Sequence, residues 1–497
     1  MSKRKTGLFV CGPFLPELPG IFGRGGTRDS SESLAEGLRG IVPQKGGGKS
    51  KGPRPSCPGV STVLSQLVFC PFLIDRQVSK MVYFSRNPVI WDFGSIFPMV
   101  KTETTERREK MIRYDYQKHN EDVRRQLELK KLGKQERMLV SISCNPRLIL
   151  SDPALNPEGI TFEAYMKDPQ KMLEVQCRFQ EYRANNVFSD WIMGFENLEG
   201  LSAYADFQNV PEAAYYGCQV AYHGIYEPGT RVCLNDENKY DFIKKPFPDP
   251  FSGLMGECSR YYDFFQEQIK KGYTYKGKPL TGTFPSCLGT DGPFTIGCCL
   301  LGATELCILL YEEEEFAREF LEYITESTIW RIKEMRRHFG QPEKSAEFGF
   351  ADDSIAMLSP EDYRRFILPL HKKLKEELCT GENGISIHLC GDATRHFKTM
   401  VDELDARAFD TGFPVHHGQL VRQLGPEITI SGGVHVDLLR SGTPDEVAAE
   451  TRRIIDEVKP CTRNFVMKEA NNLSPGTPPE NMLRMYQTVL EYGRYGD

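Results

Sequence analysis

Two spacings of apolar residues alternate along the chain from about residue 100 onward. Short apolar runs, typical of buried strands, are separated by longer segments in which apolar residues recur every three or four positions, as on one face of a helix. The strand-like runs are residues 138–143, 187–193, 280–284, 346–350, 385–389, 408–410, 428–431 and 465–468. The helical patterns are residues 102–134, 162–186, 317–338, 360–378, 394–403, 417–424, 443–458 and 478–492.

Strands separated by helices of this length are expected to pair in parallel, with right-handed crossovers. About eight such units over some 390 residues favour a (β/α)8 TIM barrel between residues 100 and 497, with residues 195–279 as an insertion. The rival arrangement is a doubly wound open sheet, which is less favoured because no glycine-rich nucleotide turn follows the first strand.

The first 80 residues differ from the rest in composition. They are rich in glycine and proline, show little apolar periodicity, and hold twelve Lys and Arg against five Asp and Glu. We predict a disordered basic tail that lies outside the fold. A transit peptide is the alternative, but the segment has no Arg-rich amphipathic helix.

Bulk composition excludes some classes of function. The 497 residues are 40% hydrophobic and 26% charged, as in ordinary globular proteins, and the net charge of -6 gives no electrostatic reason to expect a nucleic-acid partner. No apolar run is long enough for a membrane span. Fifteen cysteines without a signal peptide or a paired C-x-x-C motif are expected to be reduced thiols in a cytoplasmic protein.

Groups able to bind a metal or move a proton follow most of the late strands. In a barrel, the active site occupies the face where strands end and loops begin, so these strand ends are the candidate site. They carry Asp352, Asp353, His388, Cys390, Asp410, His435 and Glu469. Asp353 and Asp410 could equally be turn residues, because Asp is common in turns.

His388 and Cys390 are the strongest metal candidates. They stand two positions apart at a strand end, so both side chains should point to the same side, and Gly391 lets the chain turn away directly after them. An imidazole and a thiolate are ligands that zinc takes readily, and catalytic zinc usually keeps three protein ligands. We predict Glu469 as the third; a salt bridge or hydrogen bond at the barrel rim is the alternative for that residue.

Several landmarks along the chain resemble the uroporphyrinogen decarboxylase superfamily. The resemblance covers residues 280–495 well and 135–280 loosely, and it implies a (β/α)8 barrel. The landmarks are Gly292-Pro-Phe-Thr295, the segment from Ala351 to Leu370, His388-Leu-Cys-Gly391, Ile430-Ser-Gly-Gly-Val434, Gly442-Thr-Pro-Asp-Glu-Val447 and Ser474-Pro-Gly-Thr-Pro-Pro-Glu-Asn481.

The superfamily has two main chemistries. True decarboxylases carry an Arg-rich stretch near the N-terminus that holds the carboxylate arms of a tetrapyrrole, whereas the nearest segment here supplies only Arg147. The other branch moves methyl groups between a corrinoid protein and a thiol or methylated donor. Its members resemble this chain in an H-x-C zinc motif but have a further Cys after the last strand, where this sequence has Asn471 or Asn472.

The resemblance implies a zinc-dependent methyltransferase that works with a separate corrinoid-binding protein and a small methylated substrate or thiol. Zinc would lie on His388, Cys390 and Glu469, with catalytic roles for Asp352, Asp353 and Asp410 and cofactor contacts from His435, Asn471 and Asn472. Asp352 or Asp353 would hold His388 in the correct tautomer. The alternatives are a uroporphyrinogen decarboxylase of porphyrin biosynthesis and a non-catalytic barrel that carries a corrinoid or methylated ligand.

Overall fold

A six-stranded parallel sheet forms the centre of the computed structural model, which describes residues 114–496. The predictions for residues 1–80 lie outside this range. The strand order is β1-β11-β10-β9-β8-β7, so strands that follow one another in the sequence pair side by side from β7 to β11. The strands are β1 (Leu139–Val140), β7 (Phe348–Ala351), β8 (Ile385–Leu389), β9 (Ala406–Thr411), β10 (Thr429–Val434) and β11 (Phe465–Glu469).

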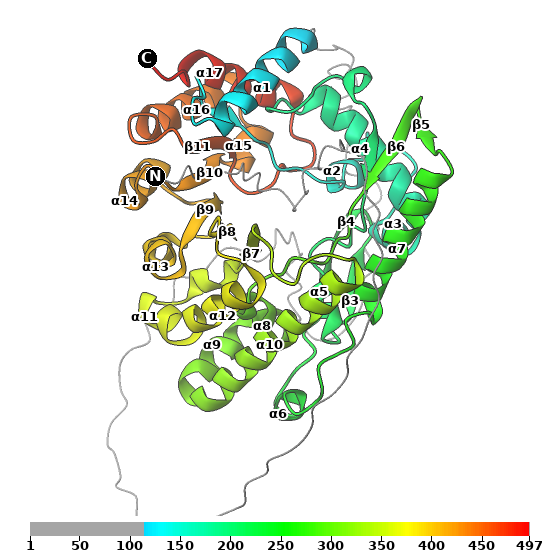
Figure 1. Cartoon of the computed structure of the whole chain (residues 1–497), viewed down its shortest axis with the longest axis vertical. Helices are drawn as coiled ribbons and strands as arrows, with labels where there is room; N and C mark the ends of the chain where they lie inside the picture. Colours follow the sequence, from blue (N-terminus) through cyan, green and yellow to red (C-terminus); the bar gives the residue numbers. More distant parts are fainter. Residues whose placement is uncertain (1–113, 497) are drawn as a thin grey trace, which may run out of the picture. The chain divides into compact units, whose positions relative to one another are not determined.

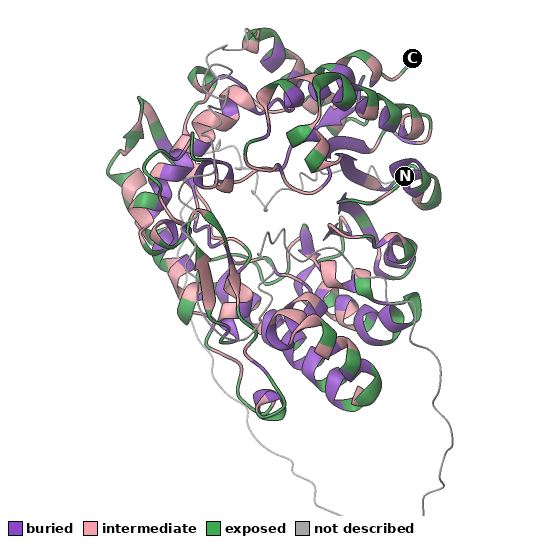
Figure 2. Ribbon diagram, turned by 180° about the vertical axis from the view of Figure 1, so that it is seen from behind, coloured by how far each residue is buried: buried purple, intermediate pink, exposed green. Residues whose placement is uncertain are grey.

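Helices before β7, between consecutive strands from β7 to β11, and after β11 cover the outer side of this sheet, as expected for right-handed βαβ units (Figure 1). They are α10 (Glu314–His338), α11 (Pro360–Asp362), α12 (Leu368–Leu378), α13 (Thr394–Leu404), α14 (His417–Leu424), α15 (Val436–Ser441), α16 (Pro444–Val458) and α17 (Pro479–Tyr492). The strands are largely buried, whereas the helices expose one side (Figure 2). The predicted parallel α/β architecture is confirmed.

A second parallel pairing lies in the earlier part of the chain. β2 (Leu201–Ala203) pairs with β6 (Lys278–Thr283), and β6 also forms an antiparallel ribbon with β5 (Thr274–Tyr275). β3 (Val220–His223) and β4 (Tyr226–Thr230) form a hairpin. The helices here are α1 (Tyr116–Lys131), α2 (Arg147–Leu150), α3 (Phe162–Lys167), α4 (Pro169–Asn186), α5 (Pro211–Tyr215), α6 (Lys239–Phe242), α7 (Gly253–Lys270), α8 (Pro293–Leu301) and α9 (Ala303–Glu312). The predicted insertion, residues 195–279, thus contains β2, a short strand of this pairing.

Single backbone contacts extend the six-stranded sheet at both edges. Next to β1, the Asp190 N–H donates to the Val140 carbonyl at 2.9 Å. Next to β7, Asp291 forms a parallel bridge with Ala351. Residues 187–193 nevertheless form no regular strand, contrary to the prediction, because the Asp190 carboxylate and the Ser189 hydroxyl take the place of backbone partners for Val140 and Ile142.

Local structure shows where two of the predicted helices are interrupted. The predicted helix at 162–186 is divided into α3 and α4 because Asp168 is extended and caps the start of α4, with Pro169 at its first position. The pattern at 360–378 contains a π-type turn, Tyr363–Ile367, between α11 and α12. At α16 the expected start is confirmed: Thr443 and Glu446 form a reciprocal capping box.

The alternation along β8 determines which side chains reach the interior of the fold. Ile385, Ile387 and Leu389 are fully buried. Each such side chain contributes about 1.5–3 kcal/mol on burial. Because side chains alternate along a strand, His388 points to the opposite face.

The cysteines only partly follow the sequence prediction. Ten of the cysteines in the described part of the chain are free, including Cys390. Cys258 on α7 and Cys287, however, form a disulfide, with Cα atoms 6.7 Å apart. The expectation that all thiols are reduced is therefore wrong for this pair, because the fold brings together two residues 29 positions apart that sequence spacing alone does not connect.

Within residues 114–496, no single helix has both the length and the apolar composition needed to cross a membrane. Helices α8 and α9 meet these criteria only as a pair, and they meet at an angle of 107°.

Candidate metal centre

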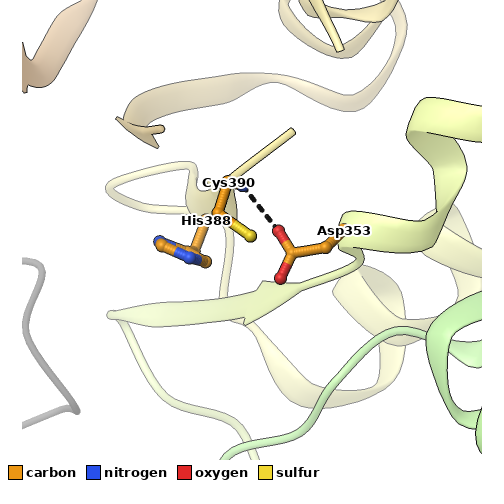
Figure 3. A group of neighbouring side chains, drawn as sticks. All are labelled: Asp353, His388 and Cys390. Atoms are coloured by element: carbon orange, nitrogen blue, oxygen red, sulfur yellow. Dashed lines mark hydrogen bonds between the residues drawn. The ribbon is translucent and has the colours of Figure 1, made fainter. Parts of the chain in front are cut away.

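His388 and Cys390 come together at the carboxyl end of β8. His388 is the fourth residue of the strand, and Cys390 is the first residue after it. Figure 3 shows the two side chains beside Asp353. About a quarter of the His388 side-chain surface, 27%, is accessible, so the ring borders open space instead of being enclosed in the core.

Asp353 is the third member of this cluster. It follows β7, the neighbour of β8, and begins a short 3-10 turn, Asp353–Met357. One of its carboxylate oxygens accepts a hydrogen bond from the Cys390 backbone N–H at 2.6 Å (Figure 3). One potential ligand atom from each of Asp353, His388 and Cys390 lies within 4.8 Å of the other two. We call these three residues the metal cluster.

Asp410 forms a hydrogen bond with one nitrogen of the His388 imidazole. His388 Nδ1 and Asp410 Oδ2 are 2.8 Å apart, and β8 and β9 place the two residues directly opposite each other. Nε2 is then the ring nitrogen left for a ligand. Burial opposes a charge on both side chains, but their attraction prevails: it raises the pKa of His388 well above its ordinary value and, with Lys468, holds the pKa of Asp410 below its own.

This contact corrects one prediction. Asp410, not Asp352 or Asp353, orients His388. The reason is the sheet order: His388 on β8 has β9 as an immediate neighbour, and the side chain opposite it is Asp410.

Asp352 lies apart from the metal cluster despite being adjacent to Asp353 in sequence. It is completely buried, and its carboxylate accepts hydrogen bonds from the Thr295 N–H and hydroxyl at 2.8 and 2.7 Å. Its other oxygen is 2.8 Å from His371 Nε2. Gly292 makes this packing possible, because a Cβ there would stand 2.2 Å from Asp352 Oδ2. These contacts tie β7 to the start of α8, so Asp352 has a structural explanation.

Glu469, the predicted third ligand, is placed beside β1 and outside the metal cluster. Both of its carboxylate oxygens are 3.1 Å from the Ser143 backbone N–H, and one is 3.5 Å from Lys468 Nζ. Burial raises the pKa of Glu469 to about 8, although Lys468 opposes this shift. The structure therefore brings Asp353, instead of Glu469, to His388 and Cys390.

The three residues predicted to contact a cofactor surround the same end of the sheet without joining the metal cluster. His435 follows β10, and its Nδ1 accepts from the Asp437 N–H at 3.2 Å, so it caps α15. Its ring also packs against that of Phe413, with centroids 4.1 Å apart. Asn471 follows β11 with a positive φ of 135°, and Asn472 has a buried Oδ1 without a partner in the described residues. Their role toward a cofactor stays a prediction.

Two charged residues that sequence analysis overlooked belong to the surroundings of the metal cluster. Lys468, which is 1% exposed, lies 2.6 Å from Asp410 Oδ1 and 2.6 Å from the Ser143 hydroxyl. Asp291 adjoins the end of β7, and burial together with Glu212 and Asp353 raises its pKa well above the ordinary value. The sequence could have indicated Lys468 as a candidate, because a lysine within an apolar strand is unusual.

The donor types of the metal cluster fit zinc. Imidazole nitrogen, thiolate sulfur and carboxylate oxygen are its usual protein ligands, and three of them leave a position for substrate. A carboxylate on the far nitrogen of the histidine, as Asp410 provides, is also usual around zinc-bound histidines. His388, Cys390 and Asp353 could therefore hold a zinc ion.

Comparison with known protein families assigns a family to the region that contains the metal cluster. Residues 267–492 match the family model described as uroporphyrinogen decarboxylase (URO-D). These residues form a URO-D family domain. The resemblance read from the sequence is confirmed, and the URO-D domain includes the whole metal cluster together with Asp410.

Relatives of the URO-D domain come from both chemical branches. A methylated-thiol--coenzyme M methyltransferase from Methanosarcina mazei is 28% identical over 214 residues, which cover 42% of this chain and 53% of the relative. A uroporphyrinogen decarboxylase from Geobacter metallireducens is 24% identical over 219 residues, or 43% of this chain and 62% of the relative. The chain thus spans only about half to three fifths of the length of these relatives.

A solved structure supports the fold over a longer range. The structure of a methyltransferase from Methanosarcina mazei aligns with a TM-score of 0.50 at 14% sequence identity, covering 74% of this chain and 98% of that chain. At this identity the comparison supports the fold and not the reaction. It agrees with the predicted (β/α)8 class.

Proposed function

We propose that the protein is a zinc-dependent methyltransferase that moves a methyl group between a small methylated donor or thiol and a corrinoid carried by a separate protein. The observation that carries this proposal is the metal cluster of His388, Cys390 and Asp353, with Asp410 behind the imidazole. The methyltransferase relative from Methanosarcina mazei supports the same chemistry, since its name specifies transfer from a methylated thiol.

Metal binding would use the three side chains of the metal cluster. Asp353 replaces Glu469 as our third ligand, because it is the carboxylate that lies beside Cys390. When bound, zinc supplies Lewis acidity that makes a coordinated thiol a better nucleophile or a methylated heteroatom a better leaving group. In transfer from a methylated corrinoid to a thiol, the methyl carbon would form a bond to the thiolate sulfur while its bond to cobalt breaks, the electron pair stays on cobalt and the thiol proton passes to solvent. In the opposite direction, the reduced cobalt would supply the electron pair of the new bond, and the donor heteroatom would keep the pair of the bond that breaks.

The surrounding residues hold the metal cluster in its reactive form. The Asp410 carboxylate accepts a hydrogen bond from the Nδ1–H of His388, which leaves Nε2 free to bind a metal. Lys468 offsets the negative charge of Asp410 and also binds the Ser143 hydroxyl. The ends of β8, β9, β11 and the segment after β1 are therefore joined by one chain of hydrogen bonds behind the site.

Methyl transfer from a methylated corrinoid to a thiol tests the proposal. We expect the purified protein to demethylate methylcobalamin in the presence of a small thiol, measured by the change in its visible spectrum, and a His388→Ala variant to lose at least 99% of the rate. The control is His416→Gln, which changes an exposed histidine away from the metal cluster. Equal rates for wild type and His388→Ala would contradict the proposal.

The decarboxylase alternative requires a different assay. Incubation with uroporphyrinogen and chromatography of the products would show stepwise loss of carboxylate arms if that alternative held. We expect no such products, because a tetrapyrrole with many carboxylates needs several arginines to hold it, and the segment that would supply them has only Arg147.

A further inference from the structure

Two free cysteines lie side by side at the base of the hairpin formed by β3 and β4. The Cys218 thiol donates a hydrogen bond to Cys233, and the two sulfur atoms are 3.1 Å apart. The sulfur atoms of a disulfide are about 2.05 Å apart, so a movement of about 1 Å would bring this pair to bonding distance. The two thiols are therefore placed to form a covalent bond with each other.

The backbone brings the two cysteines together independently of their side chains. Cys218 stands two positions before β3, and Cys233 stands three positions after β4. Beyond the paired residues of the hairpin, the Arg231 N–H donates to the Gln219 carbonyl at 3.0 Å, so the two segments stay adjacent up to the cysteines. The Cys233 N–H donates to the Leu300 carbonyl of α8 at 3.1 Å. A bond between the cysteines would thus join segments that backbone contacts already hold together.

The two thiols differ in exposure and in acidity. Cys218 is only 4% exposed, whereas Cys233 is partly exposed and follows the exposed Val232. The hydrogen bond from Cys218 lowers the pKa of the Cys233 thiol, and the charge of Lys245 acts in the same direction, although burial opposes the shift. The same hydrogen bond, together with burial, raises the pKa of Cys218. Because the thiolate is the reactive form of cysteine, Cys233 is the thiol expected to react first.

We propose that Cys218 and Cys233 are a reversible disulfide site, which a small-molecule disulfide oxidises. The Cys233 thiolate attacks one sulfur of that molecule, whose S–S bond breaks and releases a thiolate. Cys218 then loses its proton and attacks the Cys233 sulfur of the mixed disulfide, which releases the second thiolate. The two cysteines lose two electrons and two protons, and the small-molecule disulfide gains both as it becomes two thiols.

The new bond would fasten the end of α5 to the hairpin. Cys218 follows α5, whose Glu212 binds Arg331 at 2.7 Å and accepts a hydrogen bond from the Asp291 N–H at 2.7 Å. Asp291 in turn forms a parallel bridge with Ala351 in β7. Oxidation would therefore restrain a segment that is connected by contacts to the six-stranded sheet. The proposal is independent of the proposed function, because its chemistry uses no residue of the metal cluster.

Oxidation of the folded, full-length protein by glutathione disulfide tests the site. The protein would be incubated with the reagent, alkylated, digested and analysed by mass spectrometry, with and without later treatment by dithiothreitol. We expect a linked pair of peptides that contain Cys218 and Cys233, lighter by two hydrogens than the two free peptides together, and we expect dithiothreitol to separate them. Absence of this pair, or a link from Cys233 to a different cysteine in its place, would overturn the proposal.

Single substitutions test the order of the two steps. In Cys218→Ser the mixed disulfide has no second thiol to resolve it, so glutathione should remain on Cys233, whereas in Cys233→Ser the buried Cys218 should stay unmodified. Cys299→Ser is the matched control and should form the linked pair, because its backbone carbonyl, 3.7 Å from Cys218 Sγ, is retained. Glutathione on Cys218 in Cys233→Ser, or loss of the linked pair in Cys299→Ser, would contradict the proposal. If a variant loses its cooperative thermal transition, the linked pair in the wild type decides.

Discussion

Asp410 is the residue whose role depends most on a single contact. Its hydrogen bond to His388 Nδ1 is expected to fix the ring for metal binding. Loss of such a partner typically weakens metal affinity about 10- to 100-fold. We therefore expect Asp410→Asn to bind zinc about 10- to 100-fold more weakly, measured by competition with a chromophoric chelator. Asp402→Asn, a surface change beside Lys398, is the control, and equal affinities for wild type and Asp410→Asn would disprove the role.

We expect His417 to make the free energy of unfolding depend on pH. It is buried, and burial followed by the charge of Arg453 lowers its pKa to about 4 from an ordinary 6.5. The unfolded chain therefore binds a proton at a higher pH than the native protein does, so stability falls as the pH drops from 6.5 towards 4. Below pH 4, where both states bind the proton, this pKa difference corresponds to a loss of roughly 3 kcal/mol in the free energy of unfolding.

The expected result is a smaller loss of unfolding free energy between pH 6.5 and 4 in His417→Gln than in the wild type, measured by urea denaturation at each pH. Gln can still donate to the Thr411 hydroxyl, which lies 3.1 Å from Nε2 of the native ring. His223→Gln, which changes an exposed histidine on β3, should keep the wild-type slope. Identical slopes in all three proteins would show that His417 does not titrate as described.

Sequence reasoning identified individual residues more reliably than their partners. Period-two alternation correctly predicted that His388 on β8 and Cys390 directly after it come close together, because this rule is local. The third member of the metal cluster depends on which strand ends are neighbours. In the sheet, β7 lies next to β8, but β11 is separated from β8 by two strands, so Asp353 reaches Cys390 and Glu469 does not. In a barrel, strands that follow one another in the sequence are neighbours. The predicted barrel could therefore have suggested Asp353, on the strand before His388, as the third ligand.

At the scale of elements, helix starts were well specified by the sequence. Thr443 accepts from the Glu446 N–H, and Glu446 in return accepts from the Thr443 N–H at 2.8 Å. Removing a cap of this kind costs about 1 kcal/mol. We expect Thr443→Ala to lower the free energy of unfolding by about that amount in urea denaturation, while Thr443→Ser retains most of it. A loss below ~0.3 kcal/mol in Thr443→Ala would contradict the capping account.

The elements that were predicted poorly share one physical cause. Residues 187–193 are apolar enough for a strand, but side chains of Ser189 and Asp190 satisfy the β1 backbone in place of a ladder. Local patterns do not reveal that side chains replace a strand partner in this way, because the residues involved are 47 and 50 positions apart. The strands β8 to β11, whose neighbours are also their neighbours in sequence, were placed within a few residues.

At the scale of the whole molecule, the order of strands and the chemistry of the strand ends support each other. Parallel strands direct their carboxyl ends to one face, so groups from β7, β8, β9 and β11 gather there. The URO-D family domain, residues 267–492, spans these strands.

Zinc analysis of the purified full-length protein tests the central claim most directly. The protein would be expressed with zinc present, dialysed against metal-free buffer and measured by atomic emission, next to His388→Ala, Asp353→Ala and, as the control, Cys461→Ala, which removes a free thiol outside the metal cluster. The account predicts close to one zinc per chain in the wild type and in Cys461→Ala, and well below half in the other two. Zinc that stays at one equivalent in both His388→Ala and Asp353→Ala, or a mere trace in the wild type, would contradict it.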